Sequence, residues 1–208
     1  MTPHGAIKSK QLLAAELAYN AAGISTILIR HNDKRPIGAW AEFQKRLRTR
    51  AEIIAGRKRY PLANIGLVCG NISGITVLDL DGQKGLTTFN THLAHLFPTT
   101  RTHLTPSGGH HLVFKYHPGF YTGAAFLEGV DIRNDGGYIV APPSVFEGKQ
   151  YQVIDQTIPA DITTVPIEFK RRTTPQTPSA PRTPFPIPSD MPRMLDMVQM
   201  AAPRKVTT

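Results

Sequence analysis

Two aspartates separated by one residue end a short apolar run, Ile75 to Asp81. Side chains alternate along a β-strand, so Asp79 and Asp81 would share one face of it. A third aspartate, Asp131, lies in the run Val130 to Arg133. If these strands are neighbours, the carboxylates converge, and like charges about 4 Å apart repel by about 4 kcal/mol at an effective dielectric near 20. Such a cluster binds protons or metal, and hard oxygen ligands favour Mg²⁺ or Mn²⁺ over zinc.

Phosphate chemistry fits this pattern, because two divalent ions about 4 Å apart align an attacking hydroxyl and neutralise a transferring phosphoryl group. The turn Thr105 to Gly109 could hold the phosphates. Gly108 and Gly109 would let backbone N–H groups approach a triphosphate, and Ser107 adds a hydroxyl donor. The following strand would place His111 where it can donate to a phosphate oxygen. The alternative is that this segment has no binding role and is only a hairpin turn between two strands.

Arg133 would share a strand face with Asp131. A planar guanidinium can fork onto the phosphates of a nucleotide, or it can pair with Asp131 or Asp135. The sequence leaves both alternatives open for Arg133. Asp135 is a second candidate carboxylate, but its turn position favours a capping role.

The elements that position these residues follow from periodicity and turn signals. Helical spacing and capping signals predict helices over 8–22, 49–59 and 86–97, the second opening on a Thr49/Glu52 capping box. Short apolar runs bounded by glycine predict strands over 24–29, 65–69, 75–81, 102–105, 110–116, 130–133, 138–141 and 151–154. We expect a hairpin over 129–144 that turns at Gly136 and Gly137, and an irregular insert over 117–128. Many short strands with hairpin turns indicate an α+β fold with a mainly antiparallel sheet.

Charge and composition narrow the class of protein. The 208 residues carry a net charge of +9, with 12 basic and 4 acidic side chains in residues 1–60 against 5 and 9 in residues 61–169. A basic flank beside an acidic centre is typical of a protein that binds a polyanion and holds metal elsewhere. No apolar stretch approaches the roughly 18 residues of a membrane span, and the N-terminus lacks a secretory segment, so we expect a cytoplasmic protein. The single cysteine, Cys69, excludes a disulfide framework and a multi-cysteine zinc module.

Composition also divides the chain. Beyond residue 169, seven prolines between residues 175 and 192 interrupt a segment that contains Thr, Ser and Arg and cannot hold a regular helix or sheet. We therefore expect a folded catalytic domain over residues 1–169 and a Pro-rich linker or tail over residues 170–208.

Several segments in one order carry a family resemblance. They are Asn64 to Gly70, Ile75 to Asp81, Ser107 to Phe114, and Gly129 to Arg133 continuing to Ala141-Pro-Pro-Ser144. Together they resemble the N-terminal primase-polymerase domain of phage and plasmid replication proteins, a branch of the archaeo-eukaryotic primase superfamily. The resemblance implies a sheet related to the RNA-recognition fold, with helices on one face and an N-terminal α/β extension.

The resemblance also assigns roles. It implies that two Mg²⁺ or Mn²⁺ ions are held by Asp79, Asp81 and Asp131. The residues it implies for the incoming nucleotide are His111, Ser107, Gly108, Gly109, Arg133 and Lys34, the last with template as an alternative contact. The expected activity is template-directed nucleotidyl transfer, making and extending primers on single-stranded DNA from nucleoside triphosphates. Related chains often continue through the linker into a helicase domain, a partner expected beyond this C-terminus.

Two other functions compete with this prediction. The run Val77 to Gly82 resembles the nucleophile motif of haloacid-dehalogenase-like phosphatases, but Gln83 and Lys84 replace the Thr and apolar residue expected next. A non-catalytic module that binds single-stranded nucleic acid would need only the sheet and the basic flank. Incorporation of labelled nucleotides separates the three functions.

Overall fold

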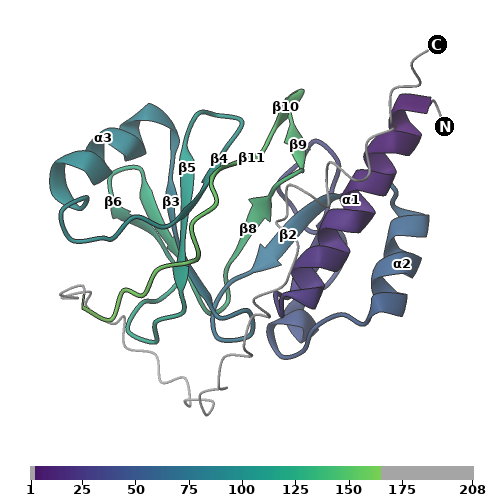
Figure 1. Cartoon of the computed structure of the whole chain (residues 1–208), viewed down its shortest axis with the longest axis horizontal. Helices are drawn as coiled ribbons and strands as arrows, with labels where there is room; N and C mark the ends of the chain where they lie inside the picture. The colour runs from purple at the N-terminus through teal and green to yellow at the C-terminus, as the bar shows by residue number, and fades with distance from the viewer. Residues whose placement is uncertain (1–2, 165–208) are drawn as a thin grey trace.

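Short apolar strands divided by glycine-containing turns form two antiparallel sheets in the computed structural model, which describes residues 3–164 (Figure 1). The larger sheet has six strands, in the order β11 (Gln152–Asp155), β4 (Arg101–Leu104), β5 (His110–Lys115), β3 (Ile75–Leu80), β7 (Val130–Arg133) and β6 (Gly123–Leu127). The smaller consists of β1 (Thr26–Ile29), β2 (Asn64–Val68) and β8 (Tyr138–Ala141), and β9 (Val145–Phe146) pairs only with β10 (Lys149–Gln150) in a short two-stranded ribbon. The α+β class and the mainly antiparallel pairing are confirmed.

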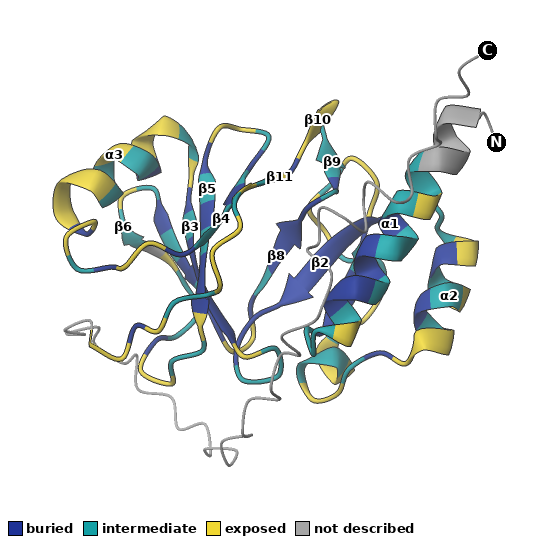
Figure 2. Cartoon of the chain, in the orientation of Figure 1, coloured by how far each residue is buried: buried dark blue, intermediate teal, exposed yellow. Residues whose placement is uncertain are grey.

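The faces of the six-stranded sheet have different partners. Leu78, Phe114 and Ile132 lie in a core cluster that includes Leu86 and Phe89 of helix α3 (Gly82–His92), so α3 covers this face. On the opposite face, Ile75 and Val77 of β3 and Val113 of β5 belong to a second core cluster, together with residues of β2, β8 and helix α1 (Pro3–Ala21). Figure 2 shows the buried strands between these layers. Towards the end of β3 that carries Asp79, this second face is polar.

The N-terminal part contains helices α1 and α2 with strands β1 and β2, and we call it the extension. Helix α1 ends before Gly23, whose φ of 78° favours glycine. A short 3₁₀ helix, η1 (Ala41–Gln44), precedes α2 (Arg50–Arg59), and the predicted capping box is present: the Thr49 hydroxyl accepts from the Glu52 amide, and the Glu52 carboxylate accepts from the Thr49 amide. Helices α1 and α2 lie on the far side of the smaller sheet from α3 (Figure 1).

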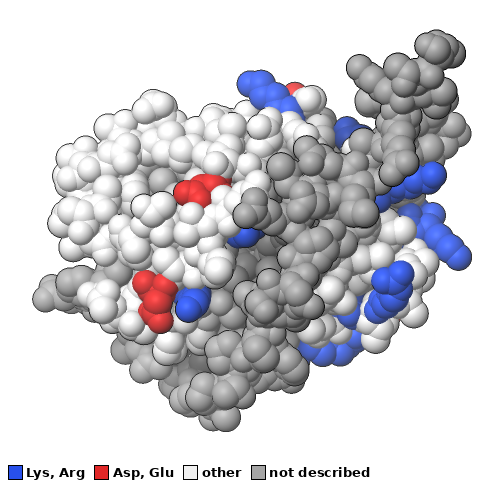
Figure 3. Space-filling view, viewed as in Figure 1, with Lys and Arg blue, Asp and Glu red and all other residues white. Residues whose placement is uncertain are grey.

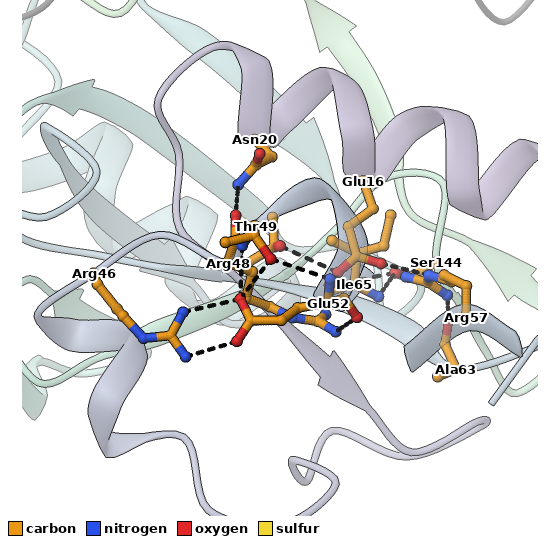
Figure 4. Close-up of polar contacts among 11 residues, drawn as sticks. Glu16, Asn20, Arg46, Arg48, Thr49, Glu52, Arg57, Ala63, Ile65 and Ser144 are labelled. Atoms are coloured by element: carbon orange, nitrogen blue, oxygen red, sulfur yellow. Dashed lines mark hydrogen bonds and ion pairs between the residues drawn. The ribbon is translucent and has the colours of Figure 1, made fainter. Parts of the chain in front are cut away.

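A buried ionic cluster holds this extension together (Figure 4). Glu16 of α1 pairs with Arg48 through Nη1 at 2.7 Å and with Arg57 of α2 through Nε. The remaining guanidinium N–H groups donate in part to backbone carbonyls, Arg48 to that of Glu52 at 2.7 Å and Arg57 to that of Ala63. All three side chains are buried, and burial lowers the pKa of Arg57 while Glu16 opposes that shift. We refer to Glu16, Arg48 and Arg57 as the buried triad.

Three expectations about the sheet are wrong. Residues 129–144 do not form a hairpin, because β7 pairs with β3 in the six-stranded sheet while β8 pairs with β2 in the smaller one. The supposed irregular insert contains an edge strand, β6, and buries Phe120 in the core. Helix α3 begins at Gly82 and ends at His92, earlier than predicted, so the preceding strand stops at Leu80 and Asp81 becomes the N-cap.

The Pro-rich segment 170–208 lies outside the described residues. Within the part of the chain that is described, no helix combines the length and apolar character needed to cross a membrane.

Candidate active site

Four polar side chains form one row across the six-stranded sheet. The antiparallel registers pair His103 of β4 with His111 of β5, His111 with Asp79 of β3, and Asp79 with Asp131 of β7. Directly opposite residues share a sheet face, so all four side chains lie on the face opposite α3. We call this set the polar row. Pairing brings together Asp79, His111 and Asp131, which are far apart in the chain.

An arginine joins the two aspartates of the row. Nη2 of Arg133 lies 2.7 Å from Oδ2 of Asp131 and 3.4 Å from Oδ2 of Asp79. Arg133 stands opposite Val77, one pleat closer to the core than the row. The two carboxylates therefore share one cationic nitrogen in this structure, which is the ion-pair alternative that the sequence left open.

The second neighbour of Asp79 is His111, whose Nε2 lies 3.4 Å from Oδ1. Burial raises the pKa of Asp79, but the hydrogen bonding and charge of His111 and Arg133 outweigh it, so the net pKa lies below its usual value. Asp79 is therefore an ionised carboxylate at neutral pH.

Asp81 stands just beyond the row, after the end of β3. Its backbone is extended, with φ −82° and ψ 107°, and its amide donates to the Gly129 carbonyl at 2.8 Å. Glycines let three segments meet there. A Cβ on Gly109 would lie 2.1 Å from the Leu80 carbonyl oxygen, and one on Gly85 would lie 2.2 Å from that of Gly129. The Ser-Gly-Gly turn is thereby packed against the end of β3.

The turn itself uses its glycine amides internally. The Gly108 amide donates to the Thr105 carbonyl at 2.9 Å, and the Gly109 amide donates to the Thr105 hydroxyl at 3.0 Å. Ser107 is exposed and shares a 3.0 Å hydroxyl contact with Thr105. A pocket of about 370 Å³ opens beside this turn, with Ser107, Gly108 and Lys149 in its lining. The two glycine amides are therefore occupied within the turn, and Ser107 is its exposed polar side chain beside the pocket.

Lys34 stands apart from the row. It is exposed in the loop after β1, with Nζ 5.3 Å from the centre of the Phe146 ring and its carbonyl accepting from the Tyr138 hydroxyl at 3.1 Å. Its neighbours therefore belong to the smaller sheet and the β9–β10 ribbon.

Sequence reasoning missed two residues at the site. His103 adds a buried imidazole to the row, and Tyr151 stacks on His111 with ring centres 5.9 Å apart and planes at 29°. The five-residue turn between β4 and β5 sets the register, so it could have revealed the pairing of His103 with His111. No local signal indicates Tyr151, which comes from a distant part of the chain.

The donor set at the row suits a divalent cation. The carboxylates of Asp79 and Asp131 already reach one cationic atom of Arg133, so they are close enough to share an ion, and both present hard oxygen ligands. Asp81 does not join them in this arrangement: among the described residues, no group of three or more potential ligands is gathered for a metal ion. The fit to a divalent cation therefore rests on the carboxylates of Asp79 and Asp131.

One comparison with known proteins identifies the family. The Prim-Pol family, described as "Bifunctional DNA primase/polymerase, N-terminal", matches residues 16–168, which include the polar row, Arg133 and the Ser-Gly-Gly turn. No curated protein matches the chain. A family match over more than half of the sequence shows that this chain belongs to the Prim-Pol family of DNA primase/polymerase domains.

Proposed function

We propose that the polar row is the catalytic centre of a template-directed nucleotidyltransferase that makes and extends primers on single-stranded DNA. The observation that carries this proposal is the cross-strand pairing of Asp79 with Asp131, beside His111, on the open part of one sheet face. Two bound Mg²⁺ or Mn²⁺ ions would align the 3′-hydroxyl and neutralise the transferring phosphoryl group. Asp79 and Asp131 would hold them, with Asp81 joining from the end of β3.

The other residues of the site would grip the incoming nucleotide. His111 presents Nε2 toward the aspartates, where it can donate to a phosphate oxygen. Arg133 can leave the carboxylates when a stronger cation replaces it, and its planar guanidinium then suits a phosphate. Ser107 and Gly108 line the adjoining pocket, where Lys149 adds positive charge, and Gly109 follows them in the turn. Lys34 is better placed for template than for the triphosphate.

The template would follow the basic face of the extension. Figure 3 shows Lys and Arg gathered on the side of the molecule that carries α1 and α2. Arg50, Lys58 and Arg59 of α2 are exposed, as is Lys45 just before it in the chain. A basic surface attracts the backbone phosphates of DNA whatever the base sequence. We also infer that residues 1–169 are the catalytic domain, with a sheet related to the RNA-recognition fold, and that residues 170–208 link it to a helicase partner.

Membership of a primase/polymerase family favours this function over both alternatives. A phosphatase would use Asp79 as a nucleophile, but here that carboxylate lies 3.4 Å from both Nη2 of Arg133 and Nε2 of His111. A binding module without catalysis would not need two aspartates paired across neighbouring strands.

Incorporation of labelled ribo- and deoxyribonucleotides on single-stranded DNA tests the proposal. With Mg²⁺ or Mn²⁺ the wild-type chain should synthesise and extend primers, and Asp131→Asn or Asp79→Asn should each lower the rate by about 100-fold or more, because a ligand of the charge-neutralising ions is lost. Asp155→Asn is the matched control, since Asp155 lies on edge strand β11 of the same sheet and its carboxylate accepts from Thr157. Retained synthesis by folded Asp131→Asn protein contradicts the assignment, and wild-type DNA binding without synthesis favours the binding module.

A further inference from the structure

The loop of residues 30–36, which follows β1, carries cationic side chains on its surface. Arg30, Lys34 and Arg35 are all exposed. The one acidic side chain of this loop, Asp33, is engaged inside it, because its carboxylate accepts from Nε of Arg35 at 2.8 Å and from the Arg35 amide at 3.0 Å. The loop therefore presents a net positive charge to solvent.

Two contacts from distant parts of the chain hold this loop in place. The side-chain oxygen of Asn32 accepts from the Glu147 amide in the β9–β10 ribbon, and the Lys34 carbonyl accepts from the Tyr138 hydroxyl of β8 at 3.1 Å. Glu147 brings one exposed carboxylate beside the three cations, so the surface stays positive. A loop that is already held in one conformation loses little entropy when it binds a ligand.

Three partly buried aromatic rings adjoin the loop. Nζ of Lys34 lies 5.3 Å from the centre of the Phe146 ring, and Trp40 meets Tyr138 edge-on with ring centres 5.2 Å apart. Aromatic rings set among cations are typical of surfaces that bind single-stranded nucleic acid, because bases stack on the rings while the cations contact phosphates. We call these three rings and the loop the aromatic-basic patch.

The aromatic-basic patch adjoins the polar row. Its three rings pack against a core cluster that contains Tyr151, and Tyr151 stacks on His111 of the row. Burial raises the pKa of Tyr138, and the charges of Arg133 and Asp33 act on it in opposite directions, so its hydroxyl lies between the site and the loop. A strand that lay on the patch would therefore pass beside the groups assigned to the reaction.

We propose that the aromatic-basic patch holds the single-stranded DNA template beside the polar row, with Lys34 and Arg35 on backbone phosphates and bases against the rings of Trp40 and Phe146. This inference rests on the proposed function, which requires a template next to the reacting groups. The basic face of the extension would attract the strand by charge, and the patch would fix the nucleotides that lie nearest the site.

The fluorescence of Trp40 tests the contact directly, because Trp40 is the single tryptophan of the chain. Oligothymidylate added to the full-length protein without nucleotide or metal should quench this fluorescence, and an abasic oligonucleotide of the same length should not. The anisotropy of a labelled oligonucleotide measures binding independently. Wild-type protein whose Trp40 fluorescence stays unchanged when anisotropy shows saturation, or that binds no oligothymidylate, overturns the proposal, and this measurement needs no variant to fold.

Variants separate the cations from the rings. Lys34→Met should reduce the slope of log affinity against log salt by about 0.7, the value for one phosphate contact on a single strand. Phe146→Leu should weaken binding about fivefold or more and leave the slope unchanged. The matched controls are Lys84→Met and Phe89→Leu in α3, which covers the opposite face of the six-stranded sheet, and both should bind like the wild type. Folded Lys34→Met and Phe146→Leu proteins that also bind like the wild type overturn the inference.

Primer synthesis distinguishes failure of this inference from failure of the proposed function. If the wild type synthesises primers and both patch variants match it in rate and affinity, the template does not lie on the patch and the proposed function stands. If the wild type binds oligothymidylate with quenching of Trp40 but incorporates no nucleotide, the patch is a binding surface for single-stranded DNA and the proposed function is contradicted.

Discussion

The buried triad and the candidate site are two clusters in which carboxylates meet guanidinium groups, and they differ in exposure and in charge. In the buried triad the side chains of Glu16, Arg48 and Arg57 are 0–7% exposed, whereas those of Asp79, Asp131 and Arg133 are 25–30% exposed. The buried triad has two guanidinium groups for one carboxylate, and the site has the reverse ratio. The same chemical groups therefore stabilise the fold in one place and leave a partly open, negative centre in the other.

The surroundings explain the difference. The buried triad ties separate segments together, and Arg48 and Arg57 each also donate to a backbone carbonyl, so these contacts are lost only when the segments separate. The site aspartates lie on neighbouring strands whose pairing does not depend on their charge. A cation that displaced Arg133 would therefore leave the backbone pairing of these strands in place. The ion pairs of Arg133 are partly exposed and open to competition, unlike those of the buried triad.

The largest effect is expected from breaking the buried triad. Glu16→Gln would leave two buried guanidinium groups without a carboxylate, and removing one partner of a buried ion pair costs about 3–5 kcal/mol. Urea denaturation followed by circular dichroism measures this loss. Glu52→Gln is the control, because the Glu52 carboxylate pairs with Arg46 at an exposed site, where such pairs contribute about 1 kcal/mol or less. Equal losses in the two variants would mean that burial does not determine how much an ion pair of this protein contributes to the free energy of unfolding.

A second effect concerns the buried end of the polar row. Burial lowers the pKa of His103 below the usual 6.5, so the unfolded chain takes up a proton at a pH where the folded chain does not. The free energy of unfolding should be highest above about pH 6.5 and should fall as the pH decreases below it, by at most about 1.4 kcal/mol per pH unit for one proton. Urea denaturation between about pH 5 and 7.5 measures the slope. His103→Phe should reduce it to the smaller part due to His110, whose pKa burial also lowers; an unchanged slope would contradict the assignment to His103.

Local signals were enough for the parts of the site that depend on neighbouring residues. The alternation in β3 and β5 placed Asp79 and His111 on their correct faces, and the capping box fixed the start of α2. The turn after β4 has five residues, which sets the register of its hairpin. These features follow from interactions within a few residues of each other.

Features decided by packing between distant segments were not predictable. The glycines at 136 and 137 suit a hairpin turn, but β7 and β8 separate because each finds a partner in a different sheet. Helix α3 carries Gly82 and Gly85 in its first turn although glycine is a poor helix former, and Gly85 is needed there because a Cβ would lie 2.2 Å from the Gly129 carbonyl oxygen. Close approach at that point outweighs local propensity. Arg133 became an ion-pair partner for the same reason, because pairing of β7 with β3 sets it beside both aspartates.

The smallest effect sharpens the comparison at the site itself. If Arg133 occupies a place that a divalent cation takes in the working enzyme, Arg133→Met should bind Mn²⁺ more tightly, by up to about fivefold, since a partly exposed ion pair contributes about 1 kcal/mol. Free Mn²⁺ measured by electron paramagnetic resonance reports this affinity. Arg101→Met is the matched control: the register places Arg101 on the same face and in line with Arg133, two strands beyond Val77, and Nη2 of Arg101 donates to the Gln156 carbonyl. Unchanged or weaker Mn²⁺ binding by Arg133→Met, with Arg101→Met like the wild type, would show that the guanidinium does not compete for the aspartates, and the two clusters would then differ in burial alone.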